Sequence, residues 1–235
     1  MVVECIGLPG SGKTYLIGKL KDALTEKGIP VVNASDSRTN RISRKIAVKI
    51  LRAGVIPDRE AGGLRSRLRE ILAAGEPWAS RFGIYEDTEY TVRSAAAFVQ
   101  QYRKMMHSPK VYLFDEGLVH ALVKLCADFG ISDEIFLSMA AETENRLAGQ
   151  RLVVYNVIPV QNCMASIAER NRHICAFDEL SGEELRDILG EYERLNRCYA
   201  EHYDAVEVRR EEEDRCKTER ILERILPSAG NADRR

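Results

Sequence analysis

The feature that most constrains this chain is the stretch from Gly7 to Thr14, which reads GLPGSGKT and matches the pattern G-x-x-x-x-G-K-[ST] completely. The apolar run VVECI at 2–6 precedes it, and apolar residues at helical spacing follow it from 16 to 24. A glycine-rich turn between a strand and a helix lets backbone N–H groups converge on phosphate oxygens in front of the positive helix end. The sequence therefore predicts a phosphate-binding P-loop. Its expected binding residues are Gly7, Pro9, Gly10, Ser11, Gly12, Lys13 and Thr14.

Two side chains of this motif carry chemistry. Lys13 supplies a cation for the β- and γ-phosphates, which makes it a candidate catalytic residue. Thr14 offers a hydroxyl to a Mg²⁺ ion that bridges the same two phosphates. The motif thus predicts a nucleoside triphosphate with Mg²⁺ as the cofactor system.

A second acidic signal follows the apolar run VYLF at 111–114. A P-loop needs a partner that holds magnesium, and an acid at the end of a neighbouring strand is the usual solution. Asp115 fits this Walker-B role, with the capping of the next helix as the alternative. Glu116 is a further catalytic candidate, either toward a water molecule or toward the hydration shell of magnesium, although it could also support the turn.

Short apolar runs alternate with long helical patterns along most of the 235 residues. This alternation predicts an α/β fold, a parallel sheet with helices on both faces in three layers. We expect one domain over 1–226 and a disordered tail of small and polar residues over 227–235. The five expected strands lie within 2–6, 28–33, 110–115, 152–157 and 205–208.

The segment 38–108 between the second and third strands shows helical patterns and little strand signal, so we expect a helical insertion there. Its first part is basic: residues 38–70 contain ten Arg and Lys and three Asp and Glu, a balance of +7. Such a surface could dock a phosphorylated small molecule, a nucleotide or RNA. The alternative is a solvated helical face.

The sequence argues against several classes of protein. The chain lacks the N/T-K-x-D motif of GTPases and the L-S-G-G-Q signature of transporter ATPases, which LSGEE at 180–184 resembles only superficially. A net charge of −1 argues against a bulk polyanion binder. With a strand expected from residue 2 and no apolar run of membrane-spanning length, we expect a cytoplasmic protein without a membrane segment.

A pair of arginines follows the fourth expected strand. Arg170 and Arg172 lie in the segment 160–180, which we interpret as a LID that closes over the phosphates. Guanidinium groups there would stabilise the charge on a phosphoryl group in transfer and exclude water, so both are catalytic candidates. A solvated arginine pair at a helix end is the alternative.

Together, Gly7–Thr14, Asp115-Glu116-Gly117, the Arg170/Arg172 segment and the C-terminal helix–strand–helix order resemble the nucleoside and nucleotide kinase group of P-loop proteins. The thymidylate-kinase-like members are most similar. The resemblance implies a five-stranded parallel sheet ordered 2-3-1-4-5, ATP and Mg²⁺ as the donor system, and LID closure. It also implies that adenine lies between Arg170 and the loop near Arg209. The insertion at 38–108 lacks the acceptor motifs of a thymidylate kinase.

The acceptor is expected near the end of the second strand. Asp36 could accept the proton of an attacking hydroxyl, and Arg38 or Arg41 could hold an anionic group of the acceptor. A D-x-x-R arrangement in adenylylsulfate kinases is similar, although Arg38 is one residue closer here. The alternative for Asp36 is a helix N-cap.

Two hypotheses follow. The first is an ATP-dependent phosphotransferase on a small hydroxyl- or phosphate-bearing acceptor, nucleoside-like or nucleotide-like. The second is an NTPase switch, or a kinase directed at RNA or tRNA, that uses the basic insertion as a partner surface. The sequence allows a homodimer and does not name the acceptor.

Overall fold

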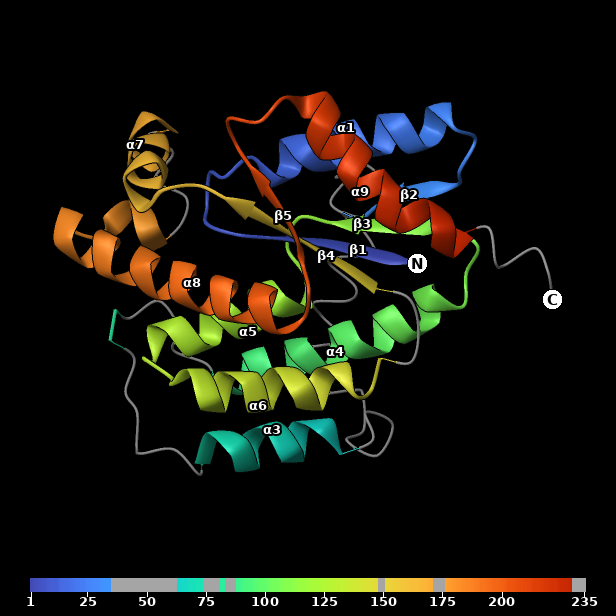
Figure 1. The fold of residues 1–235 in the computed structure, drawn as a ribbon. Helices are drawn as coiled ribbons and strands as arrows, with labels where there is room; N and C mark the ends of the chain where they lie inside the picture. The colour runs from blue at the N-terminus through green and yellow to red at the C-terminus, as the bar shows by residue number, and fades with distance from the viewer. Residues whose placement is uncertain (35–62, 74–80, 83–87, 148–150, 171–175, 230–235) are drawn as a thin grey trace.

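The computed structural model describes residues 1–34, 63–73, 81–82, 88–147, 151–170 and 176–229. Its centre is a five-stranded, all-parallel sheet with the order β2-β3-β1-β4-β5 (Figure 1). The predicted sheet and its strand order are therefore confirmed. The strands are β1 (Val2–Ile6), β2 (Val31–Asn33), β3 (Val111–Phe114), β4 (Arg151–Val157) and β5 (Val206–Arg209).

Helices cover both faces of the sheet, as Figure 1 shows. Helices α1 (Lys13–Glu26) and α9 (Asp214–Ala229) pack on one face. Helices α4 (Thr88–Met106), α5 (Leu118–Asp128) and α8 (Gly182–His202) lie on the other. Farther from the sheet on that side lie α6 (Asp133–Glu144) and then α3 (Leu64–Ala73), while α7 (Val160–Arg170) follows the end of β4.

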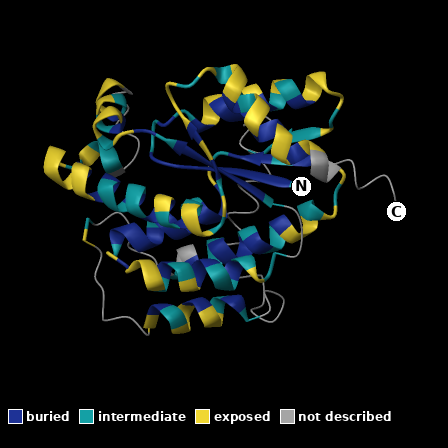
Figure 2. Cartoon of the chain, in the orientation of Figure 1, coloured by how far each residue is buried: buried dark blue, intermediate teal, exposed yellow. Residues whose placement is uncertain are grey.

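Strand alternation divides the core into two clusters. On β1, Val3 and Cys5 join the cluster of α1 and α9, whereas Val2 and Ile6 join the larger cluster of the opposite face. Every residue of β1 is buried, as expected for a central strand covered on both sides (Figure 2). Glu4 shares the face of Val2 and Ile6, so this strand places a carboxylate inside the protein.

The insertion between β2 and β3 contains α3 and α4, which fall in the helical patterns expected at 59–74 and 88–106. The pattern expected at 41–53 lies outside the described residues. At the C-terminus, α9 continues to Ala229, three residues beyond the end expected at 226, and 230–235 are not described. No helix in the described ranges is long and apolar enough to cross a membrane.

The LSGEE segment has a structural role in this fold. Ser181 is the N-cap of α8, and its hydroxyl accepts a hydrogen bond from the Glu184 amide at 3.3 Å. The Glu184 carboxylate accepts from the Ser181 amide at 3.0 Å, which completes a capping box. The segment therefore starts a 21-residue helix.

Candidate functional site

The P-loop lies between the end of β1 and the start of α1. The helix opens with the Leu16 amide donating to the Gly12 carbonyl at 2.9 Å. Gly7 adopts a φ of 129°, and a Cβ there would lie 2.4 Å from the Asn156 carbonyl oxygen. This position therefore admits only glycine, because both the backbone conformation and the packing against β4 exclude a side chain.

The Lys13 ammonium is buried inside the loop. Its Nζ donates to the carbonyls of Gly7 at 2.9 Å and Leu8 at 2.8 Å. Burial lowers the pKa of Lys13, while the nearby Glu116 carboxylate acts in the opposite direction. The predicted phosphate cation thus lies at the centre of the glycine loop, held by backbone oxygens.

Thr14 and Asp115 meet across the sheet edge, although 101 residues separate them in sequence. The Thr14 hydroxyl donates to Asp115 Oδ2 at 2.8 Å. Both are oxygen ligands of the kind that Mg²⁺ prefers, so the donor set fits this ion. Glu116 is exposed beside them and contributes to the field at Lys13.

The end of β4 and the start of α7 hold the P-loop from the side, which the sequence did not indicate. The Asn156 amide donates to the Ser11 carbonyl at 2.9 Å, and the buried Cys163 thiol donates to the Pro9 carbonyl at 2.7 Å. Among the described residues, the Ser11 hydroxyl and Asn156 Oδ1 are buried without a hydrogen-bond partner. Unpaired buried polar atoms are costly, so their presence beside the loop fits a site that receives a polar ligand.

A pocket of about 290 Å³ opens beside the loop. The first turn of α1 supplies Tyr15, and the segment after β5 supplies Arg210, Asp214 and the buried Lys217. Tyr15 Oη donates to Asp214 Oδ2 at 2.5 Å, and Lys217 Nζ lies 3.0 Å from Asp214 Oδ1. The hydrogen bond from Tyr15 and the ion pair with Lys217 lower the pKa of Asp214.

Arg209, which the resemblance placed near adenine, is not among the described residues that line this pocket. On β5, Val206 and Val208 are buried against the α9 face, so alternation turns Glu207 and Arg209 to the opposite side. Arg209 Nη2 lies 3.4 Å from Glu207 Oε1. Arg210, one residue later, lines the pocket beside the P-loop and donates to the Ser166 hydroxyl on α7 at 3.1 Å.

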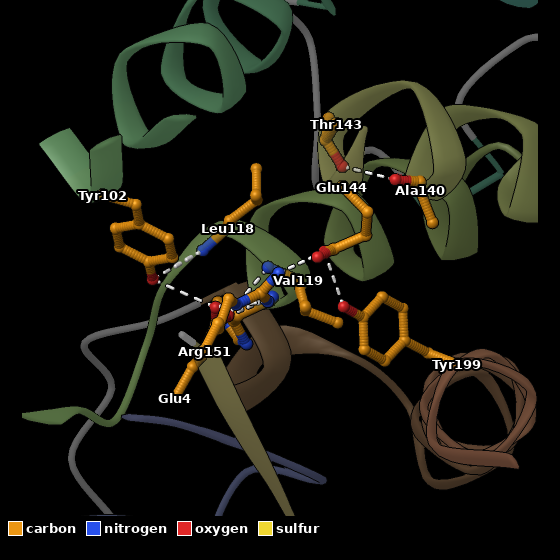
Figure 3. A network of polar contacts seen from close by, with 10 residues as sticks. Glu4, Tyr102, Leu118, Val119, Ala140, Thr143, Glu144, Arg151 and Tyr199 are labelled. Carbon is orange, nitrogen blue, oxygen red and sulfur yellow. Dashed lines mark hydrogen bonds and ion pairs between the residues drawn. The ribbon is translucent and has the colours of Figure 1, made fainter. Parts of the chain in front are cut away.

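A buried polar network surrounds the first turn of α5 (Figure 3). Glu4 Oε2 pairs with Arg151 Nη2 at 2.9 Å and accepts from Tyr102 Oη at 3.0 Å. Glu4 Oε1 accepts from the Val119 amide at 2.7 Å and the His120 amide at 3.4 Å. Because a lone Glu in an apolar strand has no distinctive pattern, sequence reasoning missed it.

His120 follows on the first turn of α5 and is partly buried. Burial lowers the pKa of His120 to about 3, and the positive charge of Lys13 adds to this. The imidazole is therefore neutral at physiological pH. It lies edge-on to Tyr192 of α8, with ring centroids 6.5 Å apart.

The structure describes the remaining predicted site residues only in part. Arg170 ends α7, and its side chain is not described; Arg172 and the acceptor candidates Asp36, Arg38 and Arg41 lie outside the described residues. β2 itself ends beside β3, where the Ala34 amide donates to the Leu113 carbonyl at 2.9 Å.

Three arginines of the basic segment, at 65, 67 and 69, are on α3, and two of them lie beside carboxylates of the protein. Arg69 Nε donates to the Glu89 carboxylate at 2.8 Å, and Arg67 lies 3.0 Å from Glu70. Both positive charges are therefore partly neutralised by neighbours on the protein.

The strand order, the glycine loop and the Thr14–Asp115 contact together define a P-loop α/β protein of the deoxynucleoside kinase fold. Among solved structures, deoxyadenosine kinase from M. mycoides with the products dCMP and a flexible dCDP bound aligns with a TM-score of 0.52 at 12% identity. The alignment covers 97% of this chain and 100% of that chain. Structures of that kinase with dATP and with dCTP give TM-scores of 0.49 and 0.48 at 12% and 15% identity. No family model and no curated protein matches the chain.

Proposed function

We propose that this protein is an ATP- and magnesium-dependent phosphotransferase that moves the γ-phosphoryl group to a small nucleoside-like or nucleotide-like acceptor. The observation that carries the proposal is the 2.8 Å contact between Thr14 and Asp115 beside the buried Lys13. It joins a hydroxyl, a carboxylate and a cation at one edge of the sheet, which is the set that triphosphate chemistry needs. The shared fold with a deoxyadenosine kinase supports a nucleoside-like acceptor over other small molecules.

Thr14 and Asp115 would hold Mg²⁺, which when bound supplies positive charge to the β- and γ-phosphates. Lys13 would leave the carbonyls of Gly7 and Leu8 for the phosphate oxygens, a change of partner that its flexible chain allows. Backbone amides of the loop would bind the remaining oxygens. Arg170 and Arg172 would close over the transferring group, as proposed for the LID.

The donor base would occupy the pocket between Tyr15 and Arg210, and this revises the expectation for Arg209. Alanine at Arg210 is expected to raise the KM for ATP with little change in kcat, since a base contact acts equally in the ground and transition states. Arg209→Ala serves as the comparison, because the resemblance places the donor base near Arg209 and the pocket places it near Arg210. If Arg209→Ala raises the KM and Arg210→Ala does not, the assignment from the resemblance holds and the pocket is not the base site.

On the acceptor side, we retain Asp36 as the proton acceptor and Arg38 and Arg41 as anion-binding residues. The thymidylate-kinase-like character of the chain and a cytoplasmic location remain part of the proposal, and the screen described below identifies the acceptor. The RNA-directed alternative receives less support, because Arg67 and Arg69 are engaged by carboxylates of the same protein.

The deciding experiment is a screen for ADP formation from ATP and Mg²⁺ with nucleosides, nucleotides, sugars and RNA, followed by mass spectrometry of the product. Acceptor-stimulated turnover with a phosphorylated product is expected. Lys13→Ala should reduce it by about 10²-fold or more. Lys27→Ala, an exposed lysine at the end of the same helix, is the matched control. Turnover that no acceptor stimulates would favour the switch, and a salt-sensitive RNA product would favour the RNA kinase.

A further inference from the structure

Helix α5 begins one residue after the Asp115-Glu116 pair, and the amides of its first turn are capped by side chains from other elements. The N-cap residue, Gly117, has no side chain to accept hydrogen bonds from the first amides. The acceptors come instead from distant elements (Figure 3). Tyr102 Oη of α4 accepts from the Leu118 amide at 3.3 Å, and Glu4 of β1 accepts from the Val119 and His120 amides. Three successive amides are thus satisfied by tertiary contacts.

The fit at Gly117 is close. A Cβ at this position would lie 2.1 Å from Tyr102 Oη and 2.7 Å from Glu4 Cδ. The backbone of the turn therefore rests directly on the two side chains. A displacement of Tyr102 Oη would be transmitted to Gly117, and hence to the residues before it.

The turn is fixed at both ends. On one side, β3 is hydrogen-bonded to β1 and β2, with Leu113 opposite Val3 and Asn33. On the other side, Glu4 and Tyr102 hold the first amides of α5. Only Asp115, Glu116 and Gly117 lie between these two anchors.

We infer that Tyr102, together with Glu4, is a positioning residue that sets the Asp115 carboxylate against Thr14 for magnesium-bound nucleotide. The inference rests on the proposed function, because it assigns Asp115 to magnesium. Among the described residues, the hydrogen bonds found for Tyr102 Oη go to Glu4 and Leu118 and not to the phosphate loop. Burial, reinforced by the Glu4 carboxylate, raises the pKa of Tyr102 well above its usual value, so the phenol keeps the proton that it donates to Glu4.

The same network contains a matched control. Tyr199 of α8 is also almost fully buried, and its Oη donates to Glu144 Oε1 at 2.7 Å. Its ring and that of Tyr102 both lie against the Arg151 guanidinium, at 5.9 and 5.6 Å. No hydrogen bond from the Tyr199 hydroxyl to the Asp115-Glu116-Gly117 turn is found among the described residues. Tyr102→Phe and Tyr199→Phe therefore remove the same atom from the same network, at its two ends.

The experiment compares ADP affinity with Mg²⁺ and with EDTA, by calorimetry, for wild type and both variants. Mg²⁺ is expected to increase ADP affinity, and Tyr102→Phe should reduce that increase by about tenfold. This is the lower end of the range of losses seen when a group that orients a metal ligand is removed. Its ADP affinity in EDTA should be unchanged. Tyr199→Phe should keep the full magnesium gain. Hydrogen exchange of the amides at 118–120 should accelerate in Tyr102→Phe only.

Equal magnesium gains in the two variants, together with equal exchange at 118–120, would overturn the inference. If wild-type protein shows neither a magnesium gain nor acceptor turnover, the proposed function fails, and the exchange data still decide whether Tyr102 holds the turn. If Tyr102→Phe does not fold, Glu4→Gln replaces it, since the amide oxygen still accepts from Val119 but no longer carries charge. The same direction of change is expected for it.

Discussion

The buried ion pair between Glu4 and Arg151 supports a quantitative prediction. The side chains are 0% and 5% exposed, and the two charged groups are 2.9 Å apart. Replacing Arg151 by Met keeps most of the volume but leaves the Glu4 carboxylate buried without its counter-ion. Removing one partner of a buried pair costs about 3–5 kcal/mol. Because domains are stable by about 5–15 kcal/mol, this loss is a large part of the total.

Glu4→Gln is expected to cost less, about 1–3 kcal/mol. The amide oxygen still accepts from Val119, and Arg151 keeps its pairing with Glu144. The double variant Glu4→Gln/Arg151→Met removes both charges of the buried pair. Glu144, the other partner of Arg151, is 21% exposed and keeps the hydrogen bond from Tyr199, so no buried charge is left without a partner. The double loss should therefore be about 2 kcal/mol smaller than the sum of the single losses, within the range for residues in contact.

Urea unfolding followed by far-UV circular dichroism gives the free energies of unfolding and tests the cycle. The control is Arg215→Met. Arg215 pairs with Glu219 at 2.8 Å, but the two side chains are 84% and 56% exposed. That variant should unfold at the urea midpoint of the wild type, because exposed ion pairs contribute little to stability. A loss below about 1 kcal/mol for Arg151→Met, or additive losses in the double variant, would refute the reasoning.

Four further predictions follow from the site. Asp115→Asn should weaken magnesium-dependent nucleotide binding far more than binding in EDTA, by calorimetry; equal losses would indicate a structural role. Between pH 7 and pH 5, the unfolded state takes up a proton near pH 6.5 that His120 in the folded state, with a pKa of about 3, does not. The free energy of unfolding should therefore decrease as the pH is lowered, by at most about 2 kcal/mol. His120→Gln should flatten that slope in urea titrations, and an unchanged slope would contradict the pKa. Alanine at Arg170 or Arg172 should lower kcat with little change in nucleotide Kd, whereas unaltered turnover would remove the LID assignment. Asp36→Asn should lower kcat for the acceptor found in the screen, and a KM effect alone would argue against a proton acceptor.

The site was predictable where function depends on contiguous residues. A phosphate loop needs glycines, a lysine and a hydroxyl at fixed spacing, so Gly7–Thr14 could be read directly. Asp115 followed from the apolar run before it. The strands were also local signals, because buried parallel strands are short apolar runs, and the order 2-3-1-4-5 came with the resemblance.

Arg209 and Arg210 show which part of the candidate site depends on packing as well as on sequence. The resemblance indicated the loop after the fifth strand, but the side that each arginine faces depends on where the strand ends and which face α9 covers. Valines at 206 and 208 already point to the face that Arg209 leaves. The alternation of apolar and charged residues on β5 can be seen in the sequence. Only the packing of α9 shows which face of the sheet each residue lies on.

The contacts that hold the site were decided by the tertiary structure alone. Glu4 and Val119 are 115 residues apart, Cys163 and Pro9 are 154 apart, and none of these types is distinctive in its own segment. A carboxylate in a strand becomes a helix cap only when the sheet order brings β1 beside β3 and α5 packs over it. The sequence by itself determined the P-loop motif at 7–14 and the position of Asp115 directly after an apolar strand. Tertiary packing decided which buried side chains hold the P-loop and the turn at Asp115 in place. Hydrogen bonds between distant segments cannot be recognised from the hydrophobic periodicity of either segment.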